Sequence, residues 1–358
     1  SYRKPTYLID KATIVRAVTK TSSGTSKVVD NTYFVTTGDL SYYKDIDTVS
    51  IVTDPENLFD PDIGIYVTGN QYLEWKRNDP SAGGMNPWDT NCKCNYYGKG
   101  KEWEREATIT IFEKGKVTIK QAISLSLKGA STRNNSAKSF EIRPKNRSQS
   151  STLLPDNKDW SGKSISEYNS FALRSVYDKG RIREKIAREI LKDRKYISTA
   201  SMKDTALFID GEFWGLYEIS EHFSDKFAEV HFGVPSDQVA LIKQNEIKDG
   251  PKQECTDYIT KSTNIASLDL TSESNYEEAS KMFDIDSLIE HYAIGIYFVI
   301  ADWPTKNEGL WKYTGSPNES KPYYDGKWRF LSFDFDFSMG ESLGGVGGAH
   351  YDQFRHIE

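Results

Sequence analysis

The alternation of apolar and polar residues in the first half of the chain is the feature that most restricts its fold. In ATITIFEKGKVTIKQAISLSLKG (107–129), isoleucine, valine or leucine recurs at alternate positions on either side of Gly115, with Glu113 and Gln121 as exceptions. A period of two places these side chains on one face of a β-strand. The segment VSIVTDPENLFDPDIGIYV (49–67) extends this β-rich region, with turns expected at Asp54-Pro55 and Asp60-Pro61.

Two further segments are typical of β-hairpins. TALFIDGEFWGLYEIS (205–220) has alternating runs on both sides of Asp210-Gly211, a dipeptide that favours a two-residue turn. Residues 7–36 alternate around a Ser/Gly-rich turn and resemble the end of a small β-sandwich. We therefore expect residues 1–38 to be the C-terminal part of a β-sandwich-like module and residues 39–358 to form the main domain.

The hydrophobic period changes after residue 170. SFALRSVYDKGRIREKIAREILKD (170–193) spaces Ile182, Ile186 and Ile190 four apart, with Ala187 and Leu191 beside them and charges elsewhere. This spacing predicts an amphipathic helix of about five turns.

A second helix is predicted in FDIDSLIEHYAIGIYFVIADW (283–303), which is apolar nearly all round and is therefore expected to be buried. It leads to the polar loop ADWPTKNEG and then to a hairpin that ends in FDFDFSMG (333–340). The sequence thus predicts an α+β fold with a β-rich N-lobe at about 48–222 and an α-rich C-lobe at about 223–358, the order of elements in protein kinases.

Composition excludes several classes of protein. The net charge is -6 and no segment is strongly basic, so nucleic acid is not an expected partner. No apolar run approaches the roughly 20 residues that a membrane-spanning helix needs. Cys92 and Cys94 lie in a long predicted loop, 69–101, and with Cys255 they do not form a zinc set; we expect ordinary thiols or one disulfide.

The loop after the apolar helix holds the first candidate site residues. Asp302 and Asn307 have four residues between them, the spacing of the aspartate and asparagine in a protein-kinase catalytic loop. In phosphoryl transfer, such an aspartate meets the acceptor hydroxyl and the asparagine holds a metal ion. Because Pro304 also favours a turn, an ordinary loop is the alternative interpretation.

The stretch FLSFDFDFSMG (330–340) supplies further carboxylates. In an alternating strand, Asp334 and Asp336 would point to one side and Phe333, Phe335 and Phe337 to the other. Two like charges on one face repel unless a cation lies between them, so Mg²⁺ at a nucleotide site would explain the pair. A solvated edge strand with one polar face is the alternative.

Small residues in KGASTRNNSAK (128–138) predict a loop whose amides could cradle phosphates. Lys138, at the start of the next strand, could reach the α and β phosphates, and Arg133 is a second candidate. Kinases also need a glutamate to pair with the lysine, and Glu184 or Glu189 of the amphipathic helix could serve. A plain hairpin turn and solvated helix charges are the alternatives.

Taken in order, these segments resemble the CotH kinase family, named for a spore coat protein, whose members are atypical secreted or surface-associated protein kinases. The resemblance covers about residues 48–340. The landmarks that carry it are VSIVTDPENLFDPDIGIYV, EWEREATITIF, LSLKGASTRNNSAKSFEI, FALRSVYDKGRIREKIAREIL, LFIDGEFWGLYEISEHFSDKF, ADWPTKNEGLWKY and FDFDFSMG.

The resemblance implies a two-lobed kinase-like fold that binds ATP with Mg²⁺ or Mn²⁺, with Ca²⁺ as an alternative metal, and phosphorylates Ser or Thr on a protein or on itself. It makes Asp302 the catalytic aspartate, Lys138 the ATP-binding lysine, and Asn307 and Asp334 the metal ligands. Asp336 is then an accessory metal ligand or a structural carboxylate.

The segment GLYEISE, which ends at Glu221, resembles the family's strand into the interlobe connection, so we expect it to meet the adenine. A secreted or cell-surface bacterial location is expected, within an extracellular, cellulosome-type assembly. Because members of the family continue with further helices, we expect the C-lobe to be incomplete at Glu358.

A different class of function stays open. The chain could be a noncatalytic kinase-like scaffold or a carbohydrate-associated module, in which the carboxylates bind calcium. Trp75, Trp88 and Trp103 would then stack on sugars, although core packing is the usual fate of tryptophan.

Overall fold

The computed structural model describes most of the chain and groups it into two compact units. The described residues are 10–35, 45–79, 81, 84–86, 92–145, 157–158, 162–165, 168–175, 180–196, 198–304, 306–348 and 350–357. Unit 1 comprises the described residues within Ser1–Asn157, Ser166–Tyr177 and Met202–Glu221. Unit 2 comprises those within Lys158–Ile165, Asp178–Ser201 and His222–Glu358.

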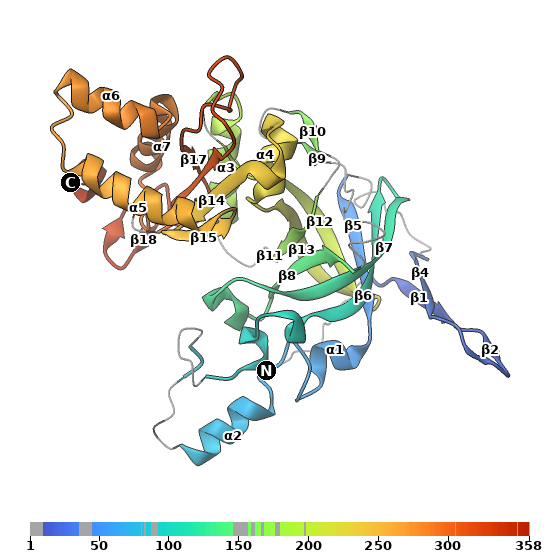
Figure 1. Cartoon of the computed structure of the whole chain (residues 1–358). Coiled ribbons are helices and arrows are strands. Elements are labelled where there is room, and N and C mark those ends of the chain that lie inside the picture. Colours follow the sequence, from blue (N-terminus) through green and yellow to red (C-terminus); the bar gives the residue numbers. More distant parts are fainter. Residues whose placement is uncertain are drawn as a thin grey trace. The chain divides into compact units, whose positions relative to one another are not determined.

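Unit 1 is built on a closed β-barrel (Figure 1). In barrel order its strands are β11 (Phe171–Ser175), β13 (Glu212–Glu221), β12 (Met202–Ile209), β5 (Asp47–Thr53), β6 (Arg105–Glu113), β7 (Lys116–Lys128) and β8 (Ser139–Pro144). The β8–β11 pair closes the barrel, and β12–β5 is its parallel pair. The alternation around Gly115 is confirmed as the β6–β7 hairpin. Nothing in the sequence predicted that the sheet closes.

The turn predicted at Asp210-Gly211 is confirmed. Both residues have positive φ, 50° and 86°, and they join β12 to β13. Two residues with positive φ match the right-handed twist of the paired strands, which explains why Asp-Gly favours this turn.

The segment after β5 differs from the prediction, because it is a short helix rather than a strand with turns. Asp54 caps the N-terminus of α1 (Pro55–Phe59) through a hydrogen bond from the Glu56 amide, and Pro55 occupies the first turn. The same residues that favour turns also begin helices.

The predicted loop 69–101 also contains regular structure. It includes α2 (Asn70–Asn78) and the 3₁₀ turn η2 (Asn95–Tyr97), and η3 (Lys101–Trp103) follows. Trp88 lies outside the described residues.

The N-terminal hairpin is confirmed as β1 (Thr13–Ala17) paired with β4 (Val29–Tyr33), with β2 (Lys20–Thr21) and β3 (Gly24–Thr25) at its tip.

Unit 2 combines helices with one antiparallel sheet. The sheet order is β15 (Glu246–Asp249), β14 (Val239–Lys243), β16 (Gly309–Tyr313) and β17 (Arg329–Leu331). The helices are α3 (Gly180–Leu191), α4 (Asp225–Phe232), α5 (Lys252–Ala266), α6 (Glu273–Met282), α7 (Ile285–Phe298) and α8 (Gln353–Ile357). The shorter elements of unit 2 are β10 (Ser164–Ile165), η5 (Ser236–Gln238), β18 (Ser342–Leu343) and β19 (Val346–Gly347). The 3₁₀ turn η4 (Ser131–Asn134) belongs to unit 1, and β9 (Asn157–Lys158) has one residue in each unit.

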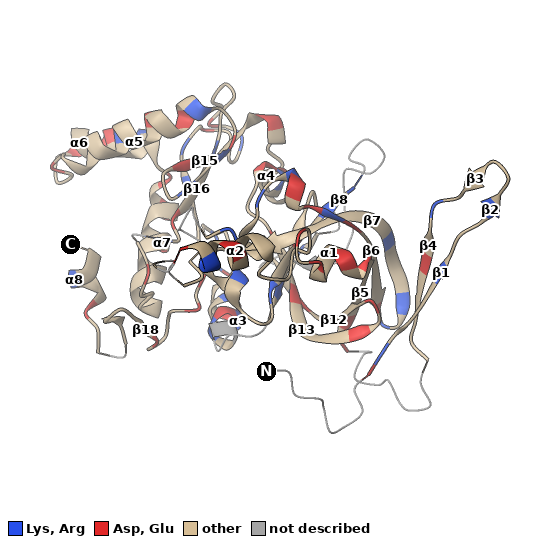
Figure 2. Ribbon diagram, turned by 90° about the horizontal axis from the view of Figure 1, so that it is seen from below, with Lys and Arg blue, Asp and Glu red and all other residues tan. Residues whose placement is uncertain are grey.

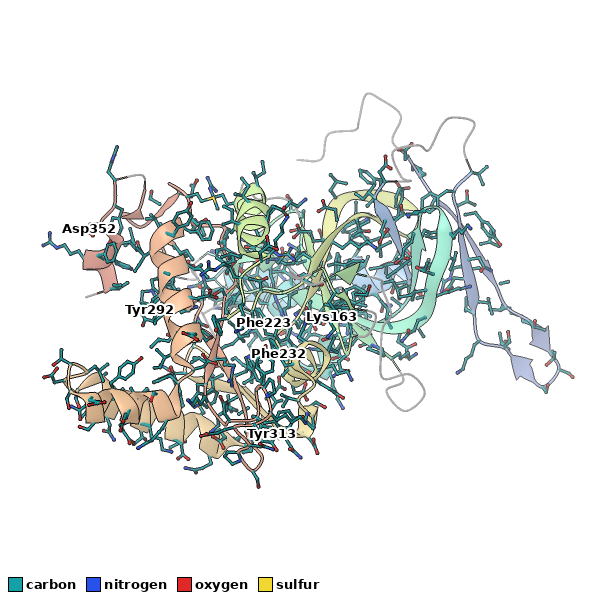
Figure 3. All side chains as sticks on the ribbon, turned by 90° about the horizontal axis from the view of Figure 1, so that it is seen from above. Lys163, Phe223, Phe232, Tyr292, Tyr313 and Asp352 are labelled. Carbon is teal, nitrogen blue, oxygen red and sulfur yellow. The ribbon has the colours of Figure 1, made fainter. Side chains whose placement is uncertain are left out.

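Aromatic side chains fill the core between α4 and the sheet. Phe223 and Phe227 pack with Trp311 and Tyr313 of β16, and Phe232 stacks on Trp311 with 4.8 Å between ring centroids. Figure 3 labels Phe223, Phe232 and Tyr313 in this region. This packing holds β14 and β16 in place, and with them the start of the loops that follow these strands.

The amphipathic helix is shorter than predicted, and only part of its predicted apolar face is buried. Residues 171–175 form barrel strand β11, and α3 begins only at Gly180. Ile182, Ile186 and Ile190 are 70%, 44% and 50% exposed. The buried face consists of Glu184, Ala187 and Leu191, of which the last two pack with Phe298, Trp303 and Phe335. Of the predicted apolar residues, Ala187 and Leu191 are therefore the ones that pack in the core.

The apolar helix is confirmed as α7, but it is not buried all round. His291, Ile294 and Phe298 face the core, whereas Ile289 and Tyr297 are 59% and 73% exposed.

The mixture of α and β structure is confirmed, and the kinase-like two-lobe arrangement stays a prediction. Across the described residues, every helix is too short or too polar to cross a membrane. Figure 2 shows acidic and basic residues interspersed along the ribbon.

Candidate functional site

The loop after α7 brings Asp302 and Asn307 together. Val299, with φ of 51°, ends α7, and Asn307, with φ of 57°, turns the chain into β16. The Asn307 amide Nδ2 donates to Asp302 Oδ2 at 2.8 Å. An amide whose nitrogen is used in this way keeps its carbonyl oxygen for another partner.

The second oxygen of Asp302 is the most informative atom of the site. Oδ1 is buried and accepts no hydrogen bond from the described residues. Burial raises the pKa of the carboxyl above its ordinary value of 3.8, the nearby charge of Asp334 raises it further, and the Asn307 hydrogen bond opposes both. A desolvated carboxylate oxygen is costly unless it meets a cation or a donor, so this oxygen fits a ligand.

The stretch around Asp334 is not the alternating strand that the sequence predicted. β17 ends at Leu331, and Asp334 has a φ of 67°, which breaks the strand alternation. Asp336 lies in the next turn, where its Oδ1 accepts from the Phe337 amide at 3.0 Å. The two aspartates therefore have different surroundings: Asp334 lies near Asp302, and the Asp336 carboxylate caps a turn.

Helix α3 holds this turn in place. The Phe335 amide donates to Glu184 Oε2 at 2.8 Å, and Arg183 donates to the Asp336 carbonyl at 3.3 Å and to Glu341 at 2.6 Å. Glu184 is 5% exposed, so this carboxylate is a buried acceptor next to Asp334. Glu189, the other candidate partner of Lys138, is exposed and pairs with Lys192.

Backbone hydrogen bonds also join the turn to the Asp302 loop. The Ala301 amide donates to the Phe337 carbonyl at 2.8 Å, and the Met339 amide donates to the Phe298 carbonyl at 2.7 Å. The residues that carry Asp302 and Asp334 therefore form one hydrogen-bonded assembly.

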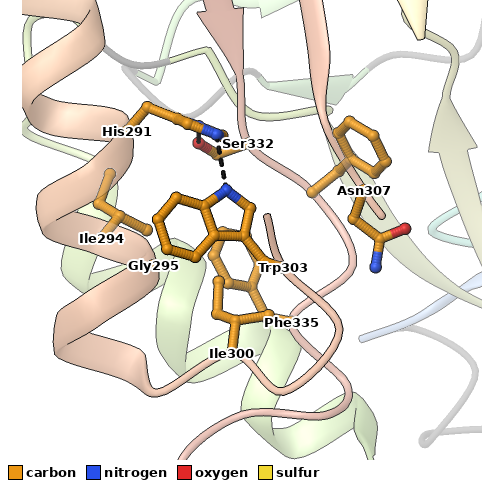
Figure 4. Close-up of a pocket in the computed structure, with 9 residues that line it drawn as sticks. His291, Ile294, Gly295, Ile300, Trp303, Asn307, Ser332 and Phe335 are labelled. Carbon is orange, nitrogen blue, oxygen red and sulfur yellow. Dashed lines mark hydrogen bonds between the residues drawn. The ribbon is translucent and has the colours of Figure 1, made fainter. Parts of the chain in front are cut away.

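His291, Trp303 and Ser332 support this assembly and were missed from the sequence (Figure 4). Trp303 Nε1 donates to His291 Nε2 at 2.8 Å, and His291 Nδ1 lies 3.1 Å from Ser332 Oγ. Indole is only a donor, so Nε2 carries no proton and the imidazole is the neutral Nδ1–H tautomer. Burial lowers the pKa of His291 to about 3, in agreement with the neutral form. The signal in the sequence was a histidine within an apolar helix.

The indole ring also explains a glycine in α7. A Cβ built at Gly295 would lie 2.4 Å from the Trp303 ring, closer than van der Waals contact allows. Together with His291, Ile294 and Phe335, these residues line a cavity of about 10 Å³, the size of one water molecule. The region is packed and serves to position the loop.

The predicted nucleotide-binding residues Lys138, Arg133 and Glu221 lie in unit 1. Lys138 Nζ donates to the carbonyls of Arg133 and Asn135 at 2.7 and 2.8 Å and lies 4.4 Å from the centroid of the Tyr96 ring. Burial lowers the pKa of Lys138 to about 8. In this structure the amine therefore stabilises its own loop.

Arg133 is bound in the same way. Its guanidinium donates to the carbonyls of Gly129 and Gly98 at 2.8 and 2.7 Å, and burial lowers its pKa. Glu221 ends β13 opposite Phe171 and is buried. Because these three residues belong to unit 1, and Asp302, Asn307 and Asp334 to unit 2, their union in one site stays a prediction.

Within the described part of the chain, histidine, cysteine, aspartate and glutamate form no group of three placed to hold a metal ion. Asn307 and Asp334 offer one amide oxygen and one carboxylate, and Asp302 lies beside both. Such oxygen donors suit Mg²⁺, which usually takes one or two carboxylates and completes its coordination with water and substrate phosphates.

Comparison with known proteins adds one finding. A family model described as CotH kinase protein matches residues 125–354, which is more than half of the chain. The matched range contains every predicted site residue, whereas the landmarks at 49–67 and 102–112 precede it. No curated protein sequence matches the chain.

Proposed function

The chain belongs to the CotH kinase protein family, and we propose that it is an atypical protein kinase that transfers the γ-phosphoryl group of ATP to a Ser or Thr hydroxyl. The observation that carries this proposal is the buried Oδ1 of Asp302, which accepts no hydrogen bond from the described residues and lies beside Asn307 and near Asp334. Phosphoryl transfer requires such a set more than it requires a covalent nucleophile.

Each residue has a distinct role in this proposal. Asp302 Oδ1 accepts the proton of the acceptor hydroxyl, and the raised pKa of its carboxyl makes it a better base than an ordinary aspartate. Asn307 orients Asp302 through Nδ2 and offers its Oδ1 to a divalent metal. Asp334 is the second metal ligand. A bound Mg²⁺ or Mn²⁺ would neutralise charge on the phosphates.

The same proposal covers the larger organisation. Unit 1 would correspond to the N-lobe and unit 2 to the C-lobe of a kinase-like fold, with Lys138, Arg133 and Glu221 contributing to ATP binding. The N-terminal hairpin β1–β4 and the family resemblance motivate a secreted or cell-surface location in a bacterium, with a protein or the kinase itself as substrate.

One observation favours a second candidate, a noncatalytic scaffold that binds calcium. The Lys138 amine is directed at carbonyl groups of its own loop, under Tyr66 and Tyr96. A kinase would have to release this amine to reach a phosphate, whereas a scaffold would not.

The experiment that separates the two candidates combines labelled phosphate transfer with calorimetry. With Mg²⁺ or Mn²⁺, a kinase moves γ-phosphate from ATP to a protein acceptor, and Asp334→Ala loses metal-dependent ATP binding. Stabilisation by Ca²⁺ alone, with no ATP binding in any metal, contradicts the kinase assignment.

A further inference from the structure

A lysine that the sequence did not single out lies beside the carboxylate loops of unit 2. Lys243 is the last residue of β14 and pairs with Gly309, the first residue of β16. The next amide, of Gln244, donates to the Glu308 carbonyl at 3.1 Å. The end of β14 therefore runs alongside the residues that directly follow Asn307.

Two phenylalanine rings hold the Lys243 amine. Nζ lies 4.7 Å from the ring centroid of Phe333 and 5.0 Å from that of Phe223, and the two rings are 5.7 Å apart. Contact of an ammonium group with two ring faces is favourable and limits the rotamers of a flexible side chain. The charge is thus preorganised before any ligand arrives.

Phe333 links this cation to the site. It directly precedes Asp334, and its ring packs on the backbone of β16, because a Cβ built at Gly309 would lie 3.1 Å from Phe333 Cε1. Lys243, Phe333 and the segment from Asn307 to Gly309 therefore form one packed group, and Asp334 is the next residue along the chain.

We propose that Lys243 is a phosphate-binding residue of this site, a role that rests on the proposed kinase function. A triphosphate brought to the mutually repelling carboxylates of Asp302 and Asp334 adds negative charge, which one divalent metal only partly offsets. Lys243 supplies a cation on the same unit as these carboxylates. Lys138 and Arg133 are bound to carbonyl groups of unit 1.

Asp249 is the competing partner for this charge. The Lys243 cation opposes the burial and the Asp225 charge that raise the pKa of Asp249, so the two side chains interact. A purely structural lysine would serve Asp249 and the aromatic rings only. The test must therefore distinguish phosphate binding from support of the fold.

The matched control is Lys312, a lysine of the same sheet that also contacts an aromatic ring. It lies 5.2 Å from the Trp328 centroid, pairs with Glu254 at 2.6 Å, and sits opposite Ala240 in β14. Lys243→Met and Lys312→Met each remove one charge while retaining an unbranched chain; the first removes two ring contacts and the second one. We compare both variants with the unsubstituted chain by calorimetry with ATP, ADP and AMP in Mg²⁺.

The expected result is a graded loss. Lys243→Met weakens ATP binding by about tenfold or more, because a hydrogen bond to a charged group contributes on this order. The loss is smaller for ADP and smallest for AMP, Lys243→Arg restores part of it, and Lys312→Met changes none of the three. An equal loss for all three nucleotides assigns Lys243 a structural role, and unchanged ATP binding overturns the proposal outright.

These outcomes stay distinct from failure of the kinase function. If the unsubstituted chain binds no nucleotide, both proposals fall together. If it binds ATP and transfers phosphate but Lys243→Met behaves like Lys312→Met, only the role of Lys243 is refuted.

Discussion

Replacing Asp302 by asparagine tests the proposed base with almost no change in shape. The carbonyl oxygen of the new amide can still accept the hydrogen bond that Asn307 Nδ2 donates to Oδ2, but the amide cannot take a proton from a hydroxyl. We expect phosphate transfer to fall by about 10²- to 10⁴-fold, the usual contribution of a general base. Binding of Mg-ATP should change by no more than about threefold, since Asp302 is not assigned as a metal ligand.

The same variant has a second expected effect, on stability. Burial and the charge of Asp334 raise the pKa of Asp302 in the folded protein above its ordinary value of 3.8. The ionised carboxylate therefore costs stability at neutral pH, and this cost disappears as pH falls through the folded-state pKa to below 3.8. Without metal, Asp302→Asn should melt above the unsubstituted chain at pH 7, with a gap that closes towards pH 4.

The assays are a labelled-phosphate time course, calorimetry with Mg-ATP and thermal melts in EDTA. Asp286→Asn, at a carboxylate in the first turn of α7, is the matched control and should alter none of them. Transfer by Asp302→Asn at the rate of the unsubstituted chain would refute the assignment of the base. A melting temperature below that of the unsubstituted chain at pH 7 would refute the account of the buried oxygen.

Three further substitutions test the support beneath the site by denaturant unfolding. Trp303→Phe leaves His291 Nε2 buried without a donor and should lower the free energy of unfolding by about 1–3 kcal/mol; an unchanged value would contradict the hydrogen bond. Gly295→Ala places a methyl group against the indole and should cost about 1–3 kcal/mol, a cost that should shrink in the Trp303→Phe background if the clash is with that ring. Glu184→Ala removes the acceptor of the Phe335 amide and should cost about 1–3 kcal/mol, whereas Glu184→Gln, which keeps an acceptor, should cost less.

Local patterns predicted the strands of the first half well, because the alternation of apolar and polar residues that marks each strand lies within the strand itself. The β6–β7 hairpin and the Asp210-Gly211 turn depend on alternation and on backbone conformations that few residues adopt. Closure of the barrel depends on the β8–β11 pair, which joins segments with unrelated local patterns. No periodicity within either segment could reveal it.

The helix α3 shows a different limit. Its apolar spacing indicated the correct type of element, but of the predicted apolar residues Ala187 and Leu191 pack against Trp303 and Phe335, whereas the isoleucines are exposed. Tertiary packing thus overrode the stronger hydrophobic pattern. The position of Glu184 under the Asp334 turn could not be predicted, since it depends on that packing.

The site itself was predicted in part. The spacing of Asp302 and Asn307 led to residues that do hydrogen-bond, because a short turn must bring its two ends together. The strand predicted for the FDFDF stretch was wrong. Its residues alternate as in a strand, but Asp334 adopts a positive φ. Residues such as Lys243 have no local signal, since their relation to the site arises only when β14 pairs with β16.

The tautomer of His291 has a consequence for every pH experiment on this protein. Between pH 6.5 and about 3 the unfolded chain takes up a proton at this histidine and the folded chain does not, so global stability falls as the medium is acidified. The folded imidazole nevertheless keeps the same bonds to Trp303 and Ser332 throughout that interval. Acid therefore lowers the stability of the fold without changing the hydrogen bonds among His291, Trp303 and Ser332, which support the Asp302 loop. A loss of turnover with falling pH, while the chain remains folded, then reports protonation of the Asp302 carboxylate and not of His291. The protonation of His291 also cancels in the difference between the melting temperatures of Asp302→Asn and the unsubstituted chain, because both proteins contain this histidine.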